Sequence, residues 1–369
     1  MTVDKDFRKA DLKYPSEFSE LLPQEFQDTP IPAHWQPLDF EVDGQKVLCI
    51  HMPAENPKAV LGFGHGFNSS PMDFEKKIRA LNISTKGVTR DSIFKTLNDQ
   101  GISVIATAFP NTKPGDKNFV ENFRRINQEF MFNENSPLFT AIDPSLPRRA
   151  LVHSACGLVA LENLNNPENA AVADKLYEKI YVMNPMLGIT NVTNVPVISS
   201  IFDAIAAKLP DEVPCNTRIG KSYMDLFNIK AAPDLPTFSQ IIEMGERAQQ
   251  YRHSLNNVED RSNLMPSEKL TFILGKDDSC TSPKIGAHIA RALGAEIKHS
   301  NGDHTPLVSD ESALTFLAND ITGTAPEINQ APHNESDLQR QFNFRQLLPR
   351  LEAPRKLFEF FRTPLSTNP

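Results

Sequence analysis

The feature that most constrains the fold of this chain is a short apolar run that leads directly into a serine flanked by small residues. Residues 150–157 read Ala-Leu-Val-His-Ser-Ala-Cys-Gly. Such a run is typical of a nucleophile elbow, a strained turn between a strand and a helix that lifts a serine hydroxyl above the end of a parallel sheet. An elbow requires a base to take the proton of the serine, an acid to orient that base, and backbone N–H groups to hold an oxyanion. The acid and then the base are expected to follow the serine along the chain.

The candidate acid lies in a polar turn after a β-rich segment. Residues 270–275 read Leu-Thr-Phe-Ile-Leu-Gly, and Asp277 and Asp278 follow that glycine. A carboxylate at the carboxyl end of a parallel strand lies at the sheet edge where open α/β sheets place their ligands. Both aspartates are therefore candidates for the acid.

The candidate base is His304, in the loop segment 300–306, which reads Ser-Asn-Gly-Asp-His-Thr-Pro. His299 competes with it, but His299 ends the strand-like run 295–299. A histidine in the following loop, beside a glycine, can reach over the sheet edge, so we predict His304 as the base.

The candidate oxyanion donors are backbone N–H groups in two places. The glycine-rich segment 62–70 follows an apolar run at residues 59–61, and Ala155 follows the predicted nucleophile. We predict that the N–H groups of Phe67 and Ala155 stabilise the oxyanion. Each such donor typically lowers the barrier by roughly 3–4 kcal/mol.

Val152 and Cys156 occupy the two positions that a nucleophile elbow brings close together, where small side chains are preferred. Cysteine is small, but valine adds bulk and β-branching, which places the elbow geometry in question. In an alternative register Cys156 is the nucleophile, and Leu158 then occupies a crowded position. The sterics of the turn favour Ser154 over Cys156.

Together these segments resemble the α/β-hydrolase superfamily, and within it the monoglyceride lipase and lysophospholipase branch. The elbow of that branch usually reads Gly-His-Ser-Met-Gly-Gly, where residues 152–157 of this chain read Val-His-Ser-Ala-Cys-Gly. A His-Gly pair opens the oxyanion loop of the branch, as His65 and Gly66 do here, and a Gly-x-x-Asp turn supplies its acid. That turn is matched by Gly275 to Asp278, which favours Asp278 over its neighbour.

The resemblance covers roughly residues 35–320 and implies an α/β fold, with a mostly parallel central sheet flanked by helices and a helical lid insertion. It implies a serine hydrolase that cleaves carboxylic esters through an acyl-enzyme, with Ser154 as nucleophile, His304 as base and Asp278 as acid. The implied substrate is a lipid-like acyl ester of the monoacylglycerol or lysophospholipid type, and neither a metal nor an organic cofactor is needed. A peptidase or amidase, an acyltransferase or thioesterase, and a non-catalytic binding protein of this fold remain alternatives.

Strand and helix patterns alternate along most of the chain, and alternation of this kind predicts a parallel sheet. The alternation stops after Pro185, where two amphipathic helices are predicted near residues 195–209 and 237–251. We interpret them as a lid over the serine, and the alternative is that their apolar stripes pack on the core. The predicted regions are an N-terminal extension (1–35), the hydrolase core (36–185 and 258–322), the helical lid or cap (186–257), and a linker with a C-terminal tail (323–369).

Charge and composition limit the kinds of partner and the cellular location that are expected for this chain. The net charge is −8 and no long basic block is present, which disfavours nucleic-acid binding. The N-terminus lacks the apolar core of a signal peptide, and no run reaches the length of a membrane span. The four cysteines lack metal-ligand spacing, so reduced thiols and a cytoplasmic location are expected.

The C-terminal segment 338–361 mixes leucine and phenylalanine with arginine and lysine, and its prolines exclude one long helix. One interpretation is a segment that contacts a membrane surface or a partner. The other is a tail that packs on its own domain or on a neighbouring subunit.

Overall fold

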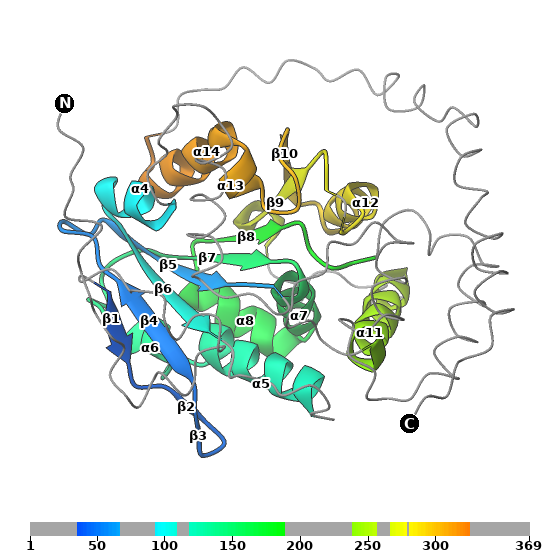
Figure 1. Cartoon of the computed structure of the whole chain (residues 1–369), viewed down its shortest axis with the longest axis horizontal. Helices are drawn as coiled ribbons and strands as arrows, with labels where there is room; N and C mark the ends of the chain where they lie inside the picture. Colours follow the sequence, from blue (N-terminus) through cyan, green and yellow to red (C-terminus); the bar gives the residue numbers. More distant parts are fainter. Residues whose placement is uncertain are drawn as a thin grey trace, which may run out of the picture. The chain divides into compact units, whose positions relative to one another are not determined.

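The computed structural model describes residues 35–66, 93–108, 118–188, 238–256, 266–278 and 280–324 (Figure 1). Its strands are β1 (Gln36–Leu38), β2 (Glu41–Val42), β3 (Gln45–Lys46), β4 (Leu48–Met52), β5 (Ala59–Gly64), β6 (Ile102–Ala108), β7 (Arg148–His153), β8 (Lys179–Met183), β9 (Leu270–Gly275) and β10 (Glu296–Ser300). Its helices are α4 (Ile93–Asp99), α5 (Phe119–Phe132), α6 (Pro137–Thr140), α7 (Ala155–Leu164), α8 (Pro167–Leu176), α11 (Phe238–Asn256), the 3₁₀ turn η2 (Ser267–Lys269), α12 (Pro283–Leu293), α13 (Pro306–Ser309) and α14 (Glu311–Thr322).

Eight of the described strands form one large sheet. The strand order in this sheet is β1-β4-β6-β5-β7-β8-β9-β10. The six strands β6, β5, β7, β8, β9 and β10 run parallel to one another. Near the other edge, β4 runs antiparallel to both of its neighbours, β1 and β6. The strands β2 and β3 form a separate hairpin. The predicted α/β fold with a mostly parallel sheet is therefore confirmed.

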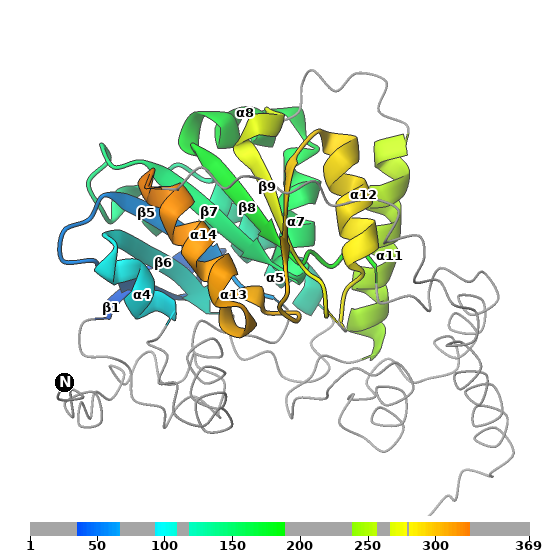
Figure 2. The ribbon, with the colours of Figure 1, turned by 90° about the horizontal axis from the view of Figure 1, so that it is seen from above.

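Helices cover both faces of the sheet (Figures 1 and 2). The helices α4, α13 and α14 pack on one face, and α5, α7, α8, α11 and α12 belong to the core on the other. Alternation along β7 divides its side chains between the two cores, since Ala150 and Val152 face α5 and α7 while Leu151 faces the opposite way. Strands buried on both faces read as continuous apolar runs, which explains why they are visible in the sequence.

The helix that follows the elbow, α7, spans Ala155–Leu164, directly after the serine as an elbow requires. Helices α5 and α8 were not predicted from the sequence. The signal for α5 was present, because its apolar residues recur at helical spacing. Its buried residues include Phe119, Phe123, Ile126 and Phe130.

Of the predicted lid, residues 186–257, the structure describes 186–188 and helix α11. This helix packs against α5 and α7. Met244, Ala248 and Tyr251 are buried there, and Arg247 forms an ion pair with Glu162 of α7 at 3.2 Å. The predicted first lid helix, the N-terminal extension up to residue 34 and the tail from residue 325 lie outside the described residues.

Among the helices that the structure describes, none combines the length and apolar character that a membrane crossing requires.

Candidate active site

Ser154 makes the turn between a strand and a helix by itself. β7 ends at the preceding residue and α7 begins at the following one. Its φ of 54° and ψ of −118° lie outside the common regions for an L-residue, a conformation that costs about 1–3 kcal/mol. The end of β8 holds it, because the Ser154 N–H donates to Met183 O at 3.0 Å and the Met186 N–H donates to Ser154 O at 2.9 Å. This is the geometry of a nucleophile elbow.

Two glycines provide the space for this turn. A Cβ on Gly66 would lie 2.8 Å from Ser154 Cβ and 3.2 Å from its Oγ, and a Cβ on Gly157 would lie 3.0 Å from Pro185 Cβ. Val152 is fully buried in the core beneath the helices. The turn therefore forms with valine in place, and the Val152 side chain lies in the core.

Cys156, the alternative nucleophile, is held in the core. It is fully buried, and its Sγ–H donates to Asn127 Oδ1 at 2.8 Å. A Cβ on Gly64 would lie 2.3 Å from this sulfur, so the thiol fills the space beside β5. Burial raises the pKa of the Cys156 thiol, which keeps it protonated and a poor nucleophile.

Ser154, His304 and Asp278 lie together at the carboxyl edge of the sheet. His304 Nε2 is 3.0 Å from Ser154 Oγ, and His304 Nδ1 is 2.9 Å from Asp278 Oδ2. An ionised carboxylate only accepts hydrogen bonds, so Nδ1 carries the proton and the lone pair of Nε2 faces the serine hydroxyl. The competing candidates, Asp277 and His299, are both exposed, and neither side chain occupies this position.

The Asp278 carboxylate is oriented by four donors. Its Oδ1 accepts from the backbone N–H groups of Cys280 at 2.7 Å and Thr281 at 2.9 Å. Its Oδ2 accepts from Thr281 Oγ1 at 2.6 Å and from His304. The side chain is fully buried, so these bonds fix its orientation. Cys280 lies beside this pair, and among the described residues Asp278, Cys280 and His304 form a set with metal-ligating side chains.

The backbone of His304 is held from two sides. Its carbonyl accepts from His153 Nε2 at 2.8 Å and from Asn184 Nδ2 at 3.0 Å. Asn184 also donates to Asp303 O at 3.0 Å and accepts from the Gly275 N–H at 2.8 Å. The rings of His153 and His304 lie 4.7 Å apart. The loop that carries the base is therefore tied to the ends of β7, β8 and β9.

Sequence reasoning missed two residues of this framework, Asn184 and Thr281. Asn184 has a φ of 41° and is almost fully buried, so it is a strained polar residue at the end of a strand. The sequence feature that could have pointed to Asn184 is an asparagine directly after an apolar run. Thr281 gave no distinct signal, because its hydroxyl acts only through the folded turn around Asp278.

The oxyanion side of the site begins where β5 ends. His65 is fully buried, and because a carbonyl only accepts, its Nδ1–H donates to Gly66 O at 3.0 Å. Burial lowers the pKa of His65 to about 4, so the ring is neutral near pH 7. Ala155 is the first residue of α7, where N–H groups have no intrahelical acceptor and the helix dipole favours negative charge. Phe67, the other predicted donor, lies outside the described residues.

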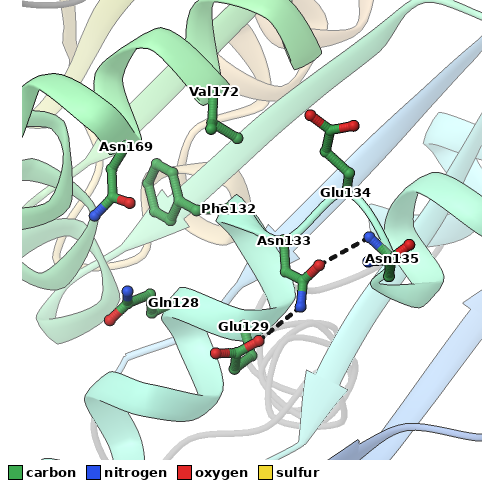
Figure 3. Close-up of a pocket in the computed structure, with 8 residues that line it drawn as sticks. All are labelled: Gln128, Glu129, Phe132, Asn133, Glu134, Asn135, Asn169 and Val172. Atoms are coloured by element: carbon green, nitrogen blue, oxygen red, sulfur yellow. Dashed lines mark hydrogen bonds between the residues drawn. The ribbon is translucent and has the colours of Figure 1, made fainter.

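Two surface cavities of the described chain lie away from these residues, where α5 ends. One, of about 340 Å³, is lined mostly by amide and carboxylate side chains (Figure 3). Glu129, Asn133 and Asn135 also line the other, of about 350 Å³. Crossover helices run back towards the amino ends of parallel strands, so this region lies at the opposite edge from Ser154. Two hydrogen bonds join polar groups of its lining: Asn133 Nδ2 donates to Glu129 at 2.7 Å, and the Asn135 N–H donates to Asn133 Oδ1 at 2.9 Å. We assign it no catalytic role.

The fold and this arrangement define the architecture as the α/β-hydrolase fold. A soluble variant of monoglyceride lipase from Saccharomyces cerevisiae, solved with a substrate analog, is similar with a TM-score of 0.52 and 14% identity, over 81% of this chain and 97% of that one. Est1E from Butyrivibrio proteoclasticus aligns with a TM-score of 0.45 and 12% identity, over 78% of this chain and 96% of that one. A carboxyl esterase from Bacillus coagulans aligns with a TM-score of 0.47 and 11% identity, over 79% and 99% of the two chains.

The first of these structures supports the fold assignment, and at this identity the likeness concerns the fold alone. No family model matches the sequence, and no curated protein matches it significantly.

Proposed function

We propose that the chain is a serine hydrolase that cleaves carboxylic esters. The observation that carries this proposal is the continuous hydrogen-bonded set Ser154–His304–Asp278, with bonds of 3.0 and 2.9 Å, built on a strained elbow. A strained backbone that places a hydroxyl against an oriented imidazole is costly to maintain in a protein that only binds. This argues against a non-catalytic binding protein of the same fold.

The proposed mechanism follows from the inferred positions of two protons, one on His304 Nδ1 and one on the Ser154 hydroxyl. Ser154 Oγ attacks the ester carbonyl carbon while His304 Nε2 takes the hydroxyl proton, and Asp278 stabilises the resulting imidazolium. The N–H groups of Ala155 and Phe67 stabilise the oxyanion. His304 then gives its proton to the leaving alcohol as the acyl-enzyme forms. Water attacks the acyl-enzyme with His304 again as base, which releases the acid and restores the serine.

We further propose that the substrate is a monoacylglycerol, a lysophospholipid or a similar medium-to-long-chain ester. The support is the resemblance of the motifs to the monoglyceride lipase branch, together with the fold likeness to a yeast monoglyceride lipase. The predicted insertion 186–257 supplies the apolar wall of the acyl pocket on this proposal.

The test of the reaction class is labelling of the purified protein with a fluorescent fluorophosphonate, which reacts with activated serines. We expect the wild type to be labelled and Ser154→Ala to lose all labelling. The matched control is Ser145→Ala, an exposed serine before β7, which keeps full labelling. Cys156→Ala also keeps labelling, because its thiol lies in the core. A wild type that stays unlabelled both in the absence and in the presence of detergent contradicts the proposal.

The test of the substrate class is a series of nitrophenyl esters of increasing acyl length, followed by monoacylglycerol and lysophospholipid of the best length. We expect kcat/KM to rise with acyl length up to the capacity of the pocket. A maximum at acetate would replace the lipid proposal with a small-ester hydrolase. Faster cleavage of a matched amide would indicate a peptidase or amidase.

A further inference from the structure

A thiol that the proposed mechanism does not use lies against the acid and the base. A carboxylate oxygen of Asp278, the sulfur of Cys280 and a ring nitrogen of His304 all lie within 4.8 Å of one another. The ring nitrogen that faces Asp278 is Nδ1, at 2.9 Å from Oδ2. We propose that these three side chains form a Zn²⁺-binding site that inhibits the enzyme. This proposal rests on the proposed function only for its consequence, and not for the binding itself.

The donor set selects the metal. Thiolate, imidazole and carboxylate are the ligands of zinc sites, whereas Mg²⁺ and Ca²⁺ prefer oxygen alone. Tetrahedral bonds of about 2.0 Å to nitrogen and oxygen and about 2.3 Å to sulfur place the ligand atoms roughly 3.2–3.6 Å apart. The Nδ1 to Oδ2 distance of 2.9 Å needs only a slight increase, and the sulfur needs a shift of about an ångström, within reach of a side-chain rotation.

The site is preoriented and reachable. Asp278 is held by the N–H groups of Cys280 and Thr281 and by the Thr281 hydroxyl, the kind of outer support that metal-ligating carboxylates have. A metal at Oδ2 replaces one hydrogen-bond donor, the Nδ1–H of His304, and leaves the other three in place. The Cys280 side chain is half-buried and His304 is 20% exposed, so solvent reaches both.

Binding of Zn²⁺ at this position would remove the base. Neutral imidazole carries one proton, on Nδ1 when it donates to Asp278. When Nδ1 gives its lone pair to Zn²⁺, that proton moves to Nε2, and the Cys280 thiol releases its own proton to solvent. His304 then presents an N–H to Ser154 instead of a lone pair, so it no longer accepts the serine proton. The inhibited state differs from the active one by one bound Zn²⁺ and one released proton.

The binding test is independent of catalysis. Zn²⁺ is titrated into the reduced full-length protein in competition with a chromophoric chelator, and Co²⁺ is used separately to detect thiolate-to-metal charge-transfer absorption. We expect one site per chain in the wild type, unchanged affinity in Ser154→Ala and in the control Cys156→Ala, and at least about tenfold weaker binding in Cys280→Ser. Equal affinity in the wild type and Cys280→Ser, or no charge-transfer band, overturns the proposal.

The inhibition test uses fluorophosphonate labelling with and without Zn²⁺. We expect Zn²⁺ to slow labelling of the wild type and a chelator to restore it, while Cys280→Ser is labelled at the same rate with or without Zn²⁺. Each variant is compared with itself, with Zn²⁺ against without it, so the test does not require Cys280→Ser to keep the basal labelling rate of the wild type. Labelling that Zn²⁺ does not slow overturns the inhibitory site and leaves the proposed hydrolase intact. An unlabelled wild type that still binds Zn²⁺ through Cys280 contradicts the hydrolase and leaves the metal site intact.

Discussion

The two edges of the central sheet differ in the burial and the backbone conformation of their polar residues. At the carboxyl edge, Ser154, Asp278 and Asn184 are buried, and two of them have positive φ angles. At the amino edge, the residues around the end of α5 line two surface cavities, but Glu134 and Asn135 are exposed and their backbone is ordinary (Figure 3). The proposed active site is therefore supported by the convergence of buried, oriented polar groups and not by the volume of a cavity.

The largest expected difference between the edges is catalytic. Asp278→Asn is expected to lower kcat by about 10⁴-fold, because the amide no longer holds the imidazole in the tautomer that accepts the serine proton. Glu129→Gln, the matched carboxylate change in the cavity at the amino edge, is expected to leave kcat within about twofold. Steady-state hydrolysis of the best nitrophenyl ester measures both. A comparable loss in Glu129→Gln would show that the amino edge takes part in the reaction.

The carboxyl edge also makes stability depend on pH through His65. The pKa of His65 is lowered from 6.5 to about 4 by burial, so between these pH values the unfolded chain binds a proton that the folded chain does not. The contribution of neutral His65 to the free energy of unfolding is fully present above pH 6.5. It falls by about 3 kcal/mol as the pH decreases towards 4. Urea unfolding across this range should show the loss. His65→Gln should flatten this slope, whereas His288→Gln, at an exposed position of α12, should keep it.

A smaller effect is expected from the close approach of the base loop to β9. A Cβ on Gly275 would lie 2.2 Å from Asp303 O and 2.8 Å from Gly302 O, both backbone atoms that cannot rotate away. Gly275→Ala should therefore displace the loop that carries His304 and lower kcat by about 10²-fold. Gly245→Ala in α11 is the control, since its Cβ meets nothing within 4 Å, and it should keep activity and gain up to about 1 kcal/mol of stability. Full activity in Gly275→Ala would mean that the base tolerates a shifted loop.

The smallest effect is expected at the rim of the amino-edge cavity. Lys175 and Glu134 form an ion pair of 2.8 Å, but their side chains are 67% and 52% exposed. A double-mutant cycle with Lys175→Met and Glu134→Gln should give a coupling free energy of at most about 0.5 kcal/mol. A coupling free energy several times larger would show that polar groups at the amino edge are held as tightly as those at the carboxyl edge.

Much of this fold was predictable because its strands are buried on both faces and its elbow helix follows a distinctive run. Ser154, Asp278 and His304, which the order of motifs selected, are the residues that the structure brings together. The role of Asn184 was not predictable, because its partners are the end of β9 and the loop that carries His304, 91 and 120 residues further along the chain. The tolerance of the elbow for Val152 depends likewise on neighbours that only the folded sheet supplies.

The distance along the chain between the nucleophile and its base has a consequence for synthesis. Ser154 and His304 are 150 residues apart in sequence, and the loop that carries His304 follows the strand at one edge of the sheet. At about 5–20 residues per second a ribosome adds those residues in roughly 8–30 s. Throughout that interval an emerging chain carries the serine without its base. On the proposed mechanism, a nascent chain is unable to attack esters until the last strand has joined the sheet.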